Sequence, residues 1–64
     1  MDTSDMLHAL HQRRLRRMVA TCLKAYEINA RAGLVEKAER ALQNAAYYER
    51  QLGDISTAEF LARR

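Results

Sequence analysis

The two glycines of this chain, together with its lack of proline, set the strongest limit on how it can fold. Gly33 and Gly53 divide the 64 residues into three segments, and glycine is the residue that most often ends a helix in the left-handed conformation. Alanine and arginine, which favour helices, are abundant in the chain as a whole. No stretch alternates with period two for long enough to make a strand. The sequence therefore predicts an all-α fold in a single small domain, residues 1–64.

The first two predicted helices form an antiparallel hairpin. Three competent N-caps occupy residues 3–5, so the first helix is expected over about residues 5–32. The second helix is expected over about residues 34–52, directly after the first glycine. Residues 33–39 and 53–59 resemble each other, which indicates that both glycines end their helices in the same way.

A short third helix is predicted over about residues 56–63. Ser56–Glu59 has the sequence of a capping box, and Ile55 and Phe60 are spaced to form the hydrophobic staple around it. We expect these two side chains, with Leu61, to fold back over the open end of the hairpin.

One side of the first helix is apolar from Leu15 to Ala32 and the other side is charged. A chain of this size buries only about 60% of its unfolded surface. It has a single cysteine, so no intrachain disulfide can add stability. The apolar face is therefore expected to be completed by a second copy in a four-helix arrangement or by another helical protein. The predicted interface consists of Leu15, Met18, Val19, Cys22, Tyr26, Val35, Ala38, Leu42 and Ala45.

The net charge of +3 is concentrated in the first half of the chain. Residues 1–33 contain six Lys or Arg and three acids, whereas the rest of the chain is balanced. A possible contact ridge, here called the basic ridge, consists of Arg13, Arg16, Arg17 and Lys24. It could bind phosphates of a nucleic acid, bind an acidic protein, or remain a solvated surface. No aromatic residues are interleaved with it to stack on bases.

Signals for catalysis, cofactors or metals are weak. His8 and His11 are three residues apart, but they lack a nearby third ligand beyond Asp5, so we expect them to pack partly buried at a helix interface. Cys22 lies within the apolar face and is expected to pack as a small hydrophobic residue. Tyr48 is expected at the edge of the core and Tyr47 on the surface. We predict no catalytic residue, no metal site and no cofactor, and hence no enzyme.

The sequence predicts a cytoplasmic protein without membrane association. No apolar run approaches the roughly 20 residues that a membrane-spanning helix needs. The first five residues are polar and acidic, which is unlike a secretory signal peptide.

Two families share parts of this pattern. Residues 10–52 resemble the small E-type co-chaperones of the type III secretion needle, through the run 27–33 and the following Leu42–Ala46. That resemblance implies a helical hairpin that holds a tetratricopeptide-type chaperone and an aggregation-prone needle subunit. The chain is also similar to small regulators of the PerC and ANR type, through the spacing of Gly33, Ala38 and Leu42 and the final arginines, Arg63 and Arg64.

The leading functional prediction is a non-enzymatic interaction module, comparable to a co-chaperone or adaptor, that binds another helical protein or itself. The alternative is a small nucleic-acid-associated regulator, in which a helical dimer presents the basic ridge to phosphates.

Overall fold

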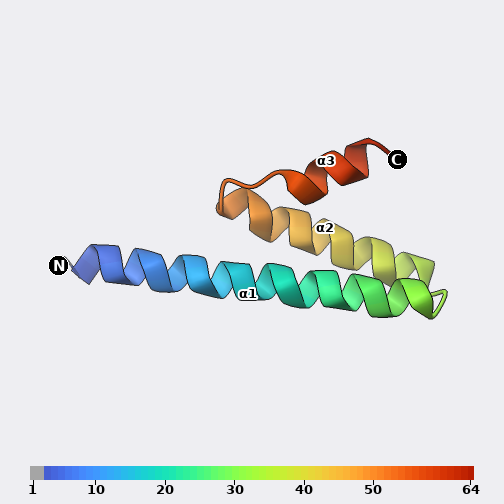
Figure 1. The fold of residues 1–64 in the computed structure, drawn as a ribbon, viewed down its shortest axis with the longest axis horizontal. Coiled ribbons are helices and arrows are strands. Elements are labelled where there is room, and N and C mark those ends of the chain that lie inside the picture. The colour runs from blue at the N-terminus through green and yellow to red at the C-terminus, as the bar shows by residue number, and fades with distance from the viewer. Residues whose placement is uncertain (1–2) are drawn as a thin grey trace.

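The computed structural model describes residues 3–64, which form three helices. Helix α1 spans Thr3–Arg31, α2 spans Val35–Gln51 and α3 spans Ser56–Ala62. Residues 3–64 contain no strand, and α1 and α2 pack against each other as an antiparallel hairpin (Figure 1). The all-α hairpin is therefore confirmed, and each helix begins and ends within two residues of the predicted positions. Residues 1–2 of the predicted domain lie outside the described part.

Both glycines end a helix through the same pair of backbone hydrogen bonds. Gly33 has φ 77°, and its N–H donates to the carbonyl three residues earlier at 3.1 Å. The N–H of Leu34 donates to the carbonyl of Asn29 at 2.9 Å, which completes a Schellman motif. Gly53, with φ 79°, repeats both bonds at 3.1 and 2.9 Å. A residue with a Cβ is strained at this φ, so the two glycines fix where the chain turns.

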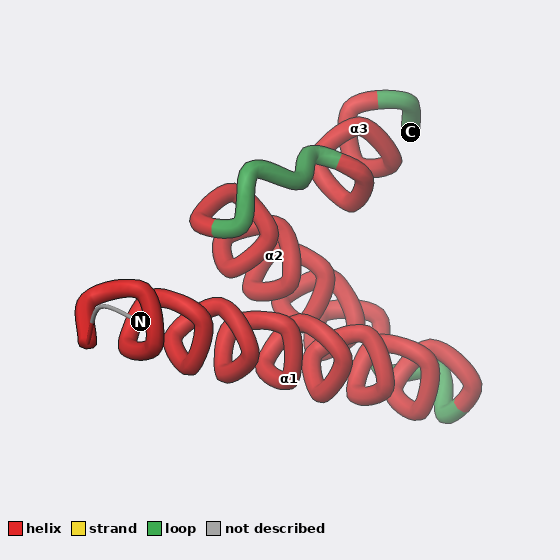
Figure 2. The backbone as a smooth tube through the Cα atoms, turned by 60° about the vertical axis from the view of Figure 1, so that its left-hand side comes forward, coloured by secondary structure: helices red, strands yellow, loops and turns green. Residues whose placement is uncertain are grey.

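The three helices make a layer only one helix thick. The Cα atoms extend over 48 × 22 × 11 Å. Helix α3 packs on α2 and does not contact α1, so α2 lies between the other two helices (Figures 1 and 2). No large side chain among the described residues is completely buried. The apolar core is a small set in which alanine predominates: Leu15, Ala38, Ala41, Leu42, Ala45 and Ala46.

The first turn of α3 is not closed by the predicted capping box. Ile55 occupies the N-cap position, and its side chain makes no capping hydrogen bond. Asp54 supplies the contact instead, because its Oδ1 accepts from the backbone N–H of Ser56 at 2.9 Å and from the Ser56 hydroxyl at 2.6 Å. These bonds favour the charged carboxylate and lower the pKa of Asp54. The capping-box prediction was wrong because an aspartate two residues before Ser56 competes for the same donors.

The residues expected to cover the open end of the hairpin do not do so. Ile55 and Phe60 are exposed and Leu61 is half-buried, because the turn after Gly53 directs α3 back along α2. The guanidinium of Arg64 lies 5.9 Å from the centre of the Phe60 ring and forms an ion pair with Glu39 of α2.

Candidate interaction surface

The predicted interface residues divide into two groups in the structure. Leu15, Ala38, Leu42 and Ala45 are buried in the contact between α1 and α2. They are therefore covered by the packing of α1 on α2, and a second protein cannot contact them while these two helices remain packed together. The rest are half-buried or exposed, namely Val19, Cys22, Tyr26, Met18 and Val35.

A second apolar surface, which the sequence analysis missed, lies on the N-terminal part of α1. Helix α1 continues past the end of α2, so that residues 3–14 project from the hairpin (Figure 1). On this overhang, Met6, Leu7 and Leu10 are 55%, 61% and 41% exposed. Their spacing, i, i+1 and i+4, was the available signal, because it places three large apolar side chains on one side of a helix.

The exposed apolar side chains of the overhang continue along one flank of α1. At about 100° per residue, these positions fall within an arc of about 120° that runs from beside the face that packs on α2 to the side opposite Leu15. We call this set the apolar flank; it consists of Met6, Leu7, Leu10, Met18 and Ile28. The same arc also contains Arg14, Arg17 and Lys24.

A hollow of about 260 Å³ lies where this flank meets α2. Met18 and Cys22 of α1 line it together with Tyr48 of α2. Burial raises the pKa of the Cys22 thiol, which keeps the thiol protonated and a weak nucleophile. Tyr48 is half-buried, as its predicted position at the edge of the core requires. Cys22, predicted to pack within the apolar face, is also half-buried. Tyr47 is exposed and meets Tyr48 edge to face, with ring centres 5.3 Å apart.

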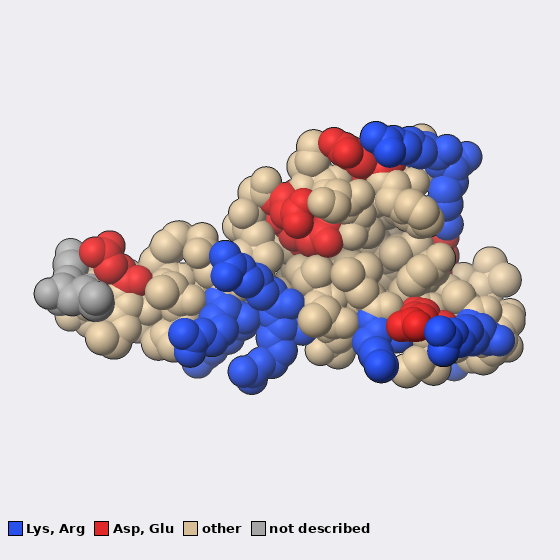
Figure 3. All heavy atoms as spheres, in the orientation of Figure 1, with Lys and Arg blue, Asp and Glu red and all other residues tan. Residues whose placement is uncertain are grey.

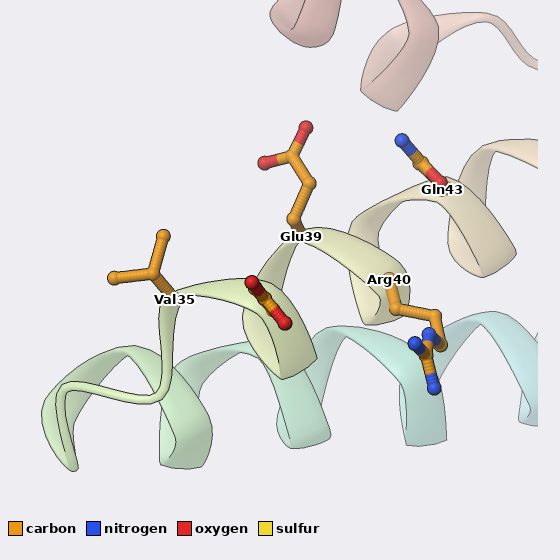
Figure 4. A pocket seen from close by; sticks show the side chains of 5 residues that line it. Val35, Glu39, Arg40 and Gln43 are labelled. Atoms are coloured by element: carbon orange, nitrogen blue, oxygen red, sulfur yellow. The ribbon is translucent and has the colours of Figure 1, made fainter.

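Another hollow, of about 420 Å³, lies on the solvent side of α2 (Figure 4). It is lined by Val35, Glu36, Glu39, Arg40 and Gln43. The side chains of Glu39 and Arg40 point in opposite directions, away from any common point (Figure 4). A hydrogen bond from Arg64 lowers the pKa of Glu39, so this carboxylate is engaged in holding the C-terminal end on α2.

The basic ridge is exposed along its whole length. Lysine and arginine side chains gather over the middle part of α1 (Figure 3). At about 100° per residue, Arg13, Arg17 and Lys24 lie on the side of the helix opposite Leu15. Among the interactions within residues 3–64, none pairs Arg13, Arg16, Arg17 or Lys24 with a carboxylate. Arg31, further along the same helix, differs because its Nη2 lies 2.8 Å from Glu27 Oε1. The ridge thus leaves four positive charges open to a partner.

The two histidines do not pack at a helix interface, contrary to the prediction. His8 and His11 are both exposed, because they lie on the overhang, where α2 is too short to reach them. No group of three metal-ligating side chains occurs within residues 3–64.

A buried carboxylate joins α2 to α3, and sequence reasoning missed it. Glu49 is 5% exposed. Its Oε2 accepts the backbone N–H of Thr57 at 2.9 Å, and its Oε1 accepts the Thr57 hydroxyl at 2.8 Å. The same residue's backbone carbonyl accepts the N–H of Asp54 in the turn. The available signal was its position four residues after Ala45, on the apolar side of α2.

None of the helices within residues 3–64 is both long enough and apolar enough to cross a membrane. Comparison with protein-family models, with curated proteins and with solved structures gives no significant match to this chain.

Proposed function

We propose that this chain is a non-enzymatic protein–protein interaction module that binds a helical protein through the apolar flank. The observation that carries the proposal is the overhang, which exposes Met6, Leu7 and Leu10 beyond the end of α2. Burying one such side chain contributes about 1.5–3 kcal/mol. Three of them, spaced along one side of a helix, match the anchors by which helices recognise each other.

The arrangement of polar groups also favours binding over catalysis. Glu39 and Arg40, which line the hollow of about 420 Å³ on α2, point away from each other, and Glu39 accepts a hydrogen bond from Arg64. Nucleophilic or acid–base chemistry needs groups within hydrogen-bond reach of a shared reacting atom. We therefore assign the chain an adaptor or co-chaperone role rather than an enzymatic one.

The partner class and location follow from the same proposal. A tetratricopeptide-type chaperone, implied by the resemblance to the E-type co-chaperones, is one helical partner that the flank could accept. The chain contains one cysteine, which suits a reducing compartment, so we assign it to the cytoplasm.

Replacing Leu7 and Leu10 together by glutamate is expected to abolish partner capture. The double variant puts two charges where apolar contact is needed, and capture should fall at least tenfold. The measurement is affinity capture of host-extract proteins on the immobilised chain, quantified by mass spectrometry. Ile55→Glu is the matched control, because Ile55 is a 56% exposed apolar residue outside both the flank and the predicted interface. Capture of the same proteins in the same amounts by the double variant would contradict the proposal.

A second candidate function is supported by the unpaired charges of the basic ridge. From Arg13 to Lys24 the ridge extends about 16 Å along α1, at 1.5 Å per residue. Four cations in a row, without acidic partners, can contact successive phosphates of a nucleic acid. A small nucleic-acid-associated regulator would use this surface, whereas the apolar flank would serve its association.

If the ridge binds phosphates, duplex DNA should give a gel shift that weakens strongly with salt. Four contacts give an expected loss of about 100-fold in affinity between 50 and 200 mM salt. Arg13→Glu with Arg17→Glu should abolish the shift. Arg40→Glu with Arg50→Glu, which changes exposed arginines of α2, should retain it because those residues lie off the ridge. Absence of any shift at low salt, with DNA or RNA, would remove this candidate.

A further inference from the structure

The chain exposes more surface than a folded protein of its mass normally does. Its accessible surface is 5196 Å², whereas a folded monomer of 7.4 kDa is expected to expose about 4,200 Å². The excess, about 1,000 Å², is close to the roughly 800 Å² that each partner contributes to a stable interface. The single-layer arrangement explains this excess, because no second layer covers the hairpin. The excess is therefore large enough to supply one side of a dimer interface.

Within residues 3–64, the overhang receives almost no cover from the other helices. Its side chains are exposed from Thr3 to Arg14, except for the half-buried Gln12, and Leu15 is the first buried side chain of α1. An unsupported helix of about 12 residues is marginal in water. A surface that covers Met6, Leu7 and Leu10 would stabilise this end of α1 as well as bury apolar area.

We propose that a second copy of this chain covers the overhang, with the two overhangs antiparallel and crossing near Leu10 on a two-fold axis. This inference rests on the proposed function and deepens it by naming the partner. In such a pair the overhang of each chain buries the apolar side chains of the other, so the same surface patch forms both sides of the interface. Leu10 packs on its counterpart, and Met6 lies against the aliphatic part of Arg14 from the other copy.

The charge distribution selects the antiparallel arrangement. Residues 13–17 carry four arginines, whereas residues 3–12 carry Asp5 and neither lysine nor arginine. Parallel overhangs would set the two arginine clusters side by side, and like charges at that distance repel. Antiparallel overhangs place each cluster near the first turns of the other copy. The same arrangement leaves Arg16 and Lys24 of the basic ridge exposed on both copies, because Arg16 lies on another side of the helix and Lys24 lies beyond the end of the other overhang.

The mass in solution tests this proposal directly. Light scattering on the purified chain should give twice 7.4 kDa, independently of any other protein. Leu7→Glu with Leu10→Glu should give the monomer mass, and Ile55→Glu should keep the dimer. Circular dichroism of each variant checks that the hairpin remains helical. A wild-type mass of 7.4 kDa at concentrations up to several hundred micromolar would overturn the proposal.

Cysteine cross-linking tests the arrangement without relying on a disruptive variant. In a Cys22→Ala background, Leu10→Cys should link two chains under mild oxidation with oxidised glutathione, because residues on the axis bring their Cα atoms within about 7 Å. Thr3→Cys should not link, since antiparallel helices separate the two copies of that position by about 20 Å. Linking at both positions would indicate parallel overhangs and overturn the arrangement.

Failure of this inference can be told apart from failure of the proposed function. If the chain is a monomer but captures another protein, and the variant with Leu7→Glu and Leu10→Glu does not capture it, the dimer proposal is wrong and the proposed interaction function is supported. If the chain is a monomer and the double variant captures the same proteins as the wild type, both are wrong.

Discussion

Replacing Leu42 by alanine is expected to unfold most of the hairpin. Leu42 is 3% exposed, and it is one of only two large side chains in the core of the described residues. A buried Leu→Ala substitution costs about 2–5 kcal/mol. A single small core rarely supplies more than about 3–5 kcal/mol in a chain below 70 residues, so this loss is comparable to the whole stability.

The measurement is urea or thermal unfolding followed by helical circular dichroism. Val35→Ala is the matched control, since it also shortens an apolar side chain of α2 but at a site that is 74% exposed. The control should keep the wild-type free energy of unfolding to within a few tenths of a kcal/mol. Equal midpoints for Leu42→Ala and the wild type would mean that α1 and α2 do not pack through this residue.

Glu49→Ala is expected to release α3 from α2 while leaving the α1–α2 hairpin folded. The substitution leaves the backbone N–H and the hydroxyl of Thr57 without their acceptors in a buried place. Each unsatisfied donor costs about 1–3 kcal/mol. Because α3 is a short helix that contacts only α2, that cost is large relative to what holds it. Exchange of the Thr57 amide proton should accelerate at least tenfold by nuclear magnetic resonance.

Two milder variants should give intermediate exchange rates for the Thr57 amide proton. Glu49→Gln keeps one acceptor oxygen, and Thr57→Val removes only the hydroxyl, so both should accelerate exchange less than Glu49→Ala. Glu36→Ala, at an exposed site in the first turn of α2, should leave it unchanged. Thr57 exchange at the wild-type rate in Glu49→Ala would show that another contact docks α3.

The parts of this fold that the sequence predicts are those that depend on local chemistry. Glycine at positions 33 and 53 fixes the helix ends because few other residues adopt a positive φ there. The hairpin follows, since two amphipathic helices joined by a short turn must pack on each other. Tyr47 and Tyr48 follow as well, because neighbouring helical positions point to different sides.

The parts that could not be predicted depend on relative lengths and on long-range contacts. His8 and His11 lie on the side of α1 that packs, but α2 is 12 residues shorter than α1 and ends before reaching them. Leu7 and Leu10 are exposed because they lie on the apolar flank, which α2 does not cover even where it runs beside α1, since Met18 and Ile28 are exposed as well. The burial of Glu49 could not be predicted because its partner, Thr57, lies across a turn whose direction the sequence does not specify.

The alanine-rich contact between α1 and α2 has a thermodynamic consequence. Alanine loses no rotamer freedom when it is buried, so Ala41 and Ala45 pack without a side-chain entropy cost. They also remove little apolar area from water, and the heat capacity change of unfolding scales with that area. The free energy of unfolding of the hairpin is therefore expected to curve only weakly with temperature, compared with a domain of the same size whose core consists of large apolar side chains.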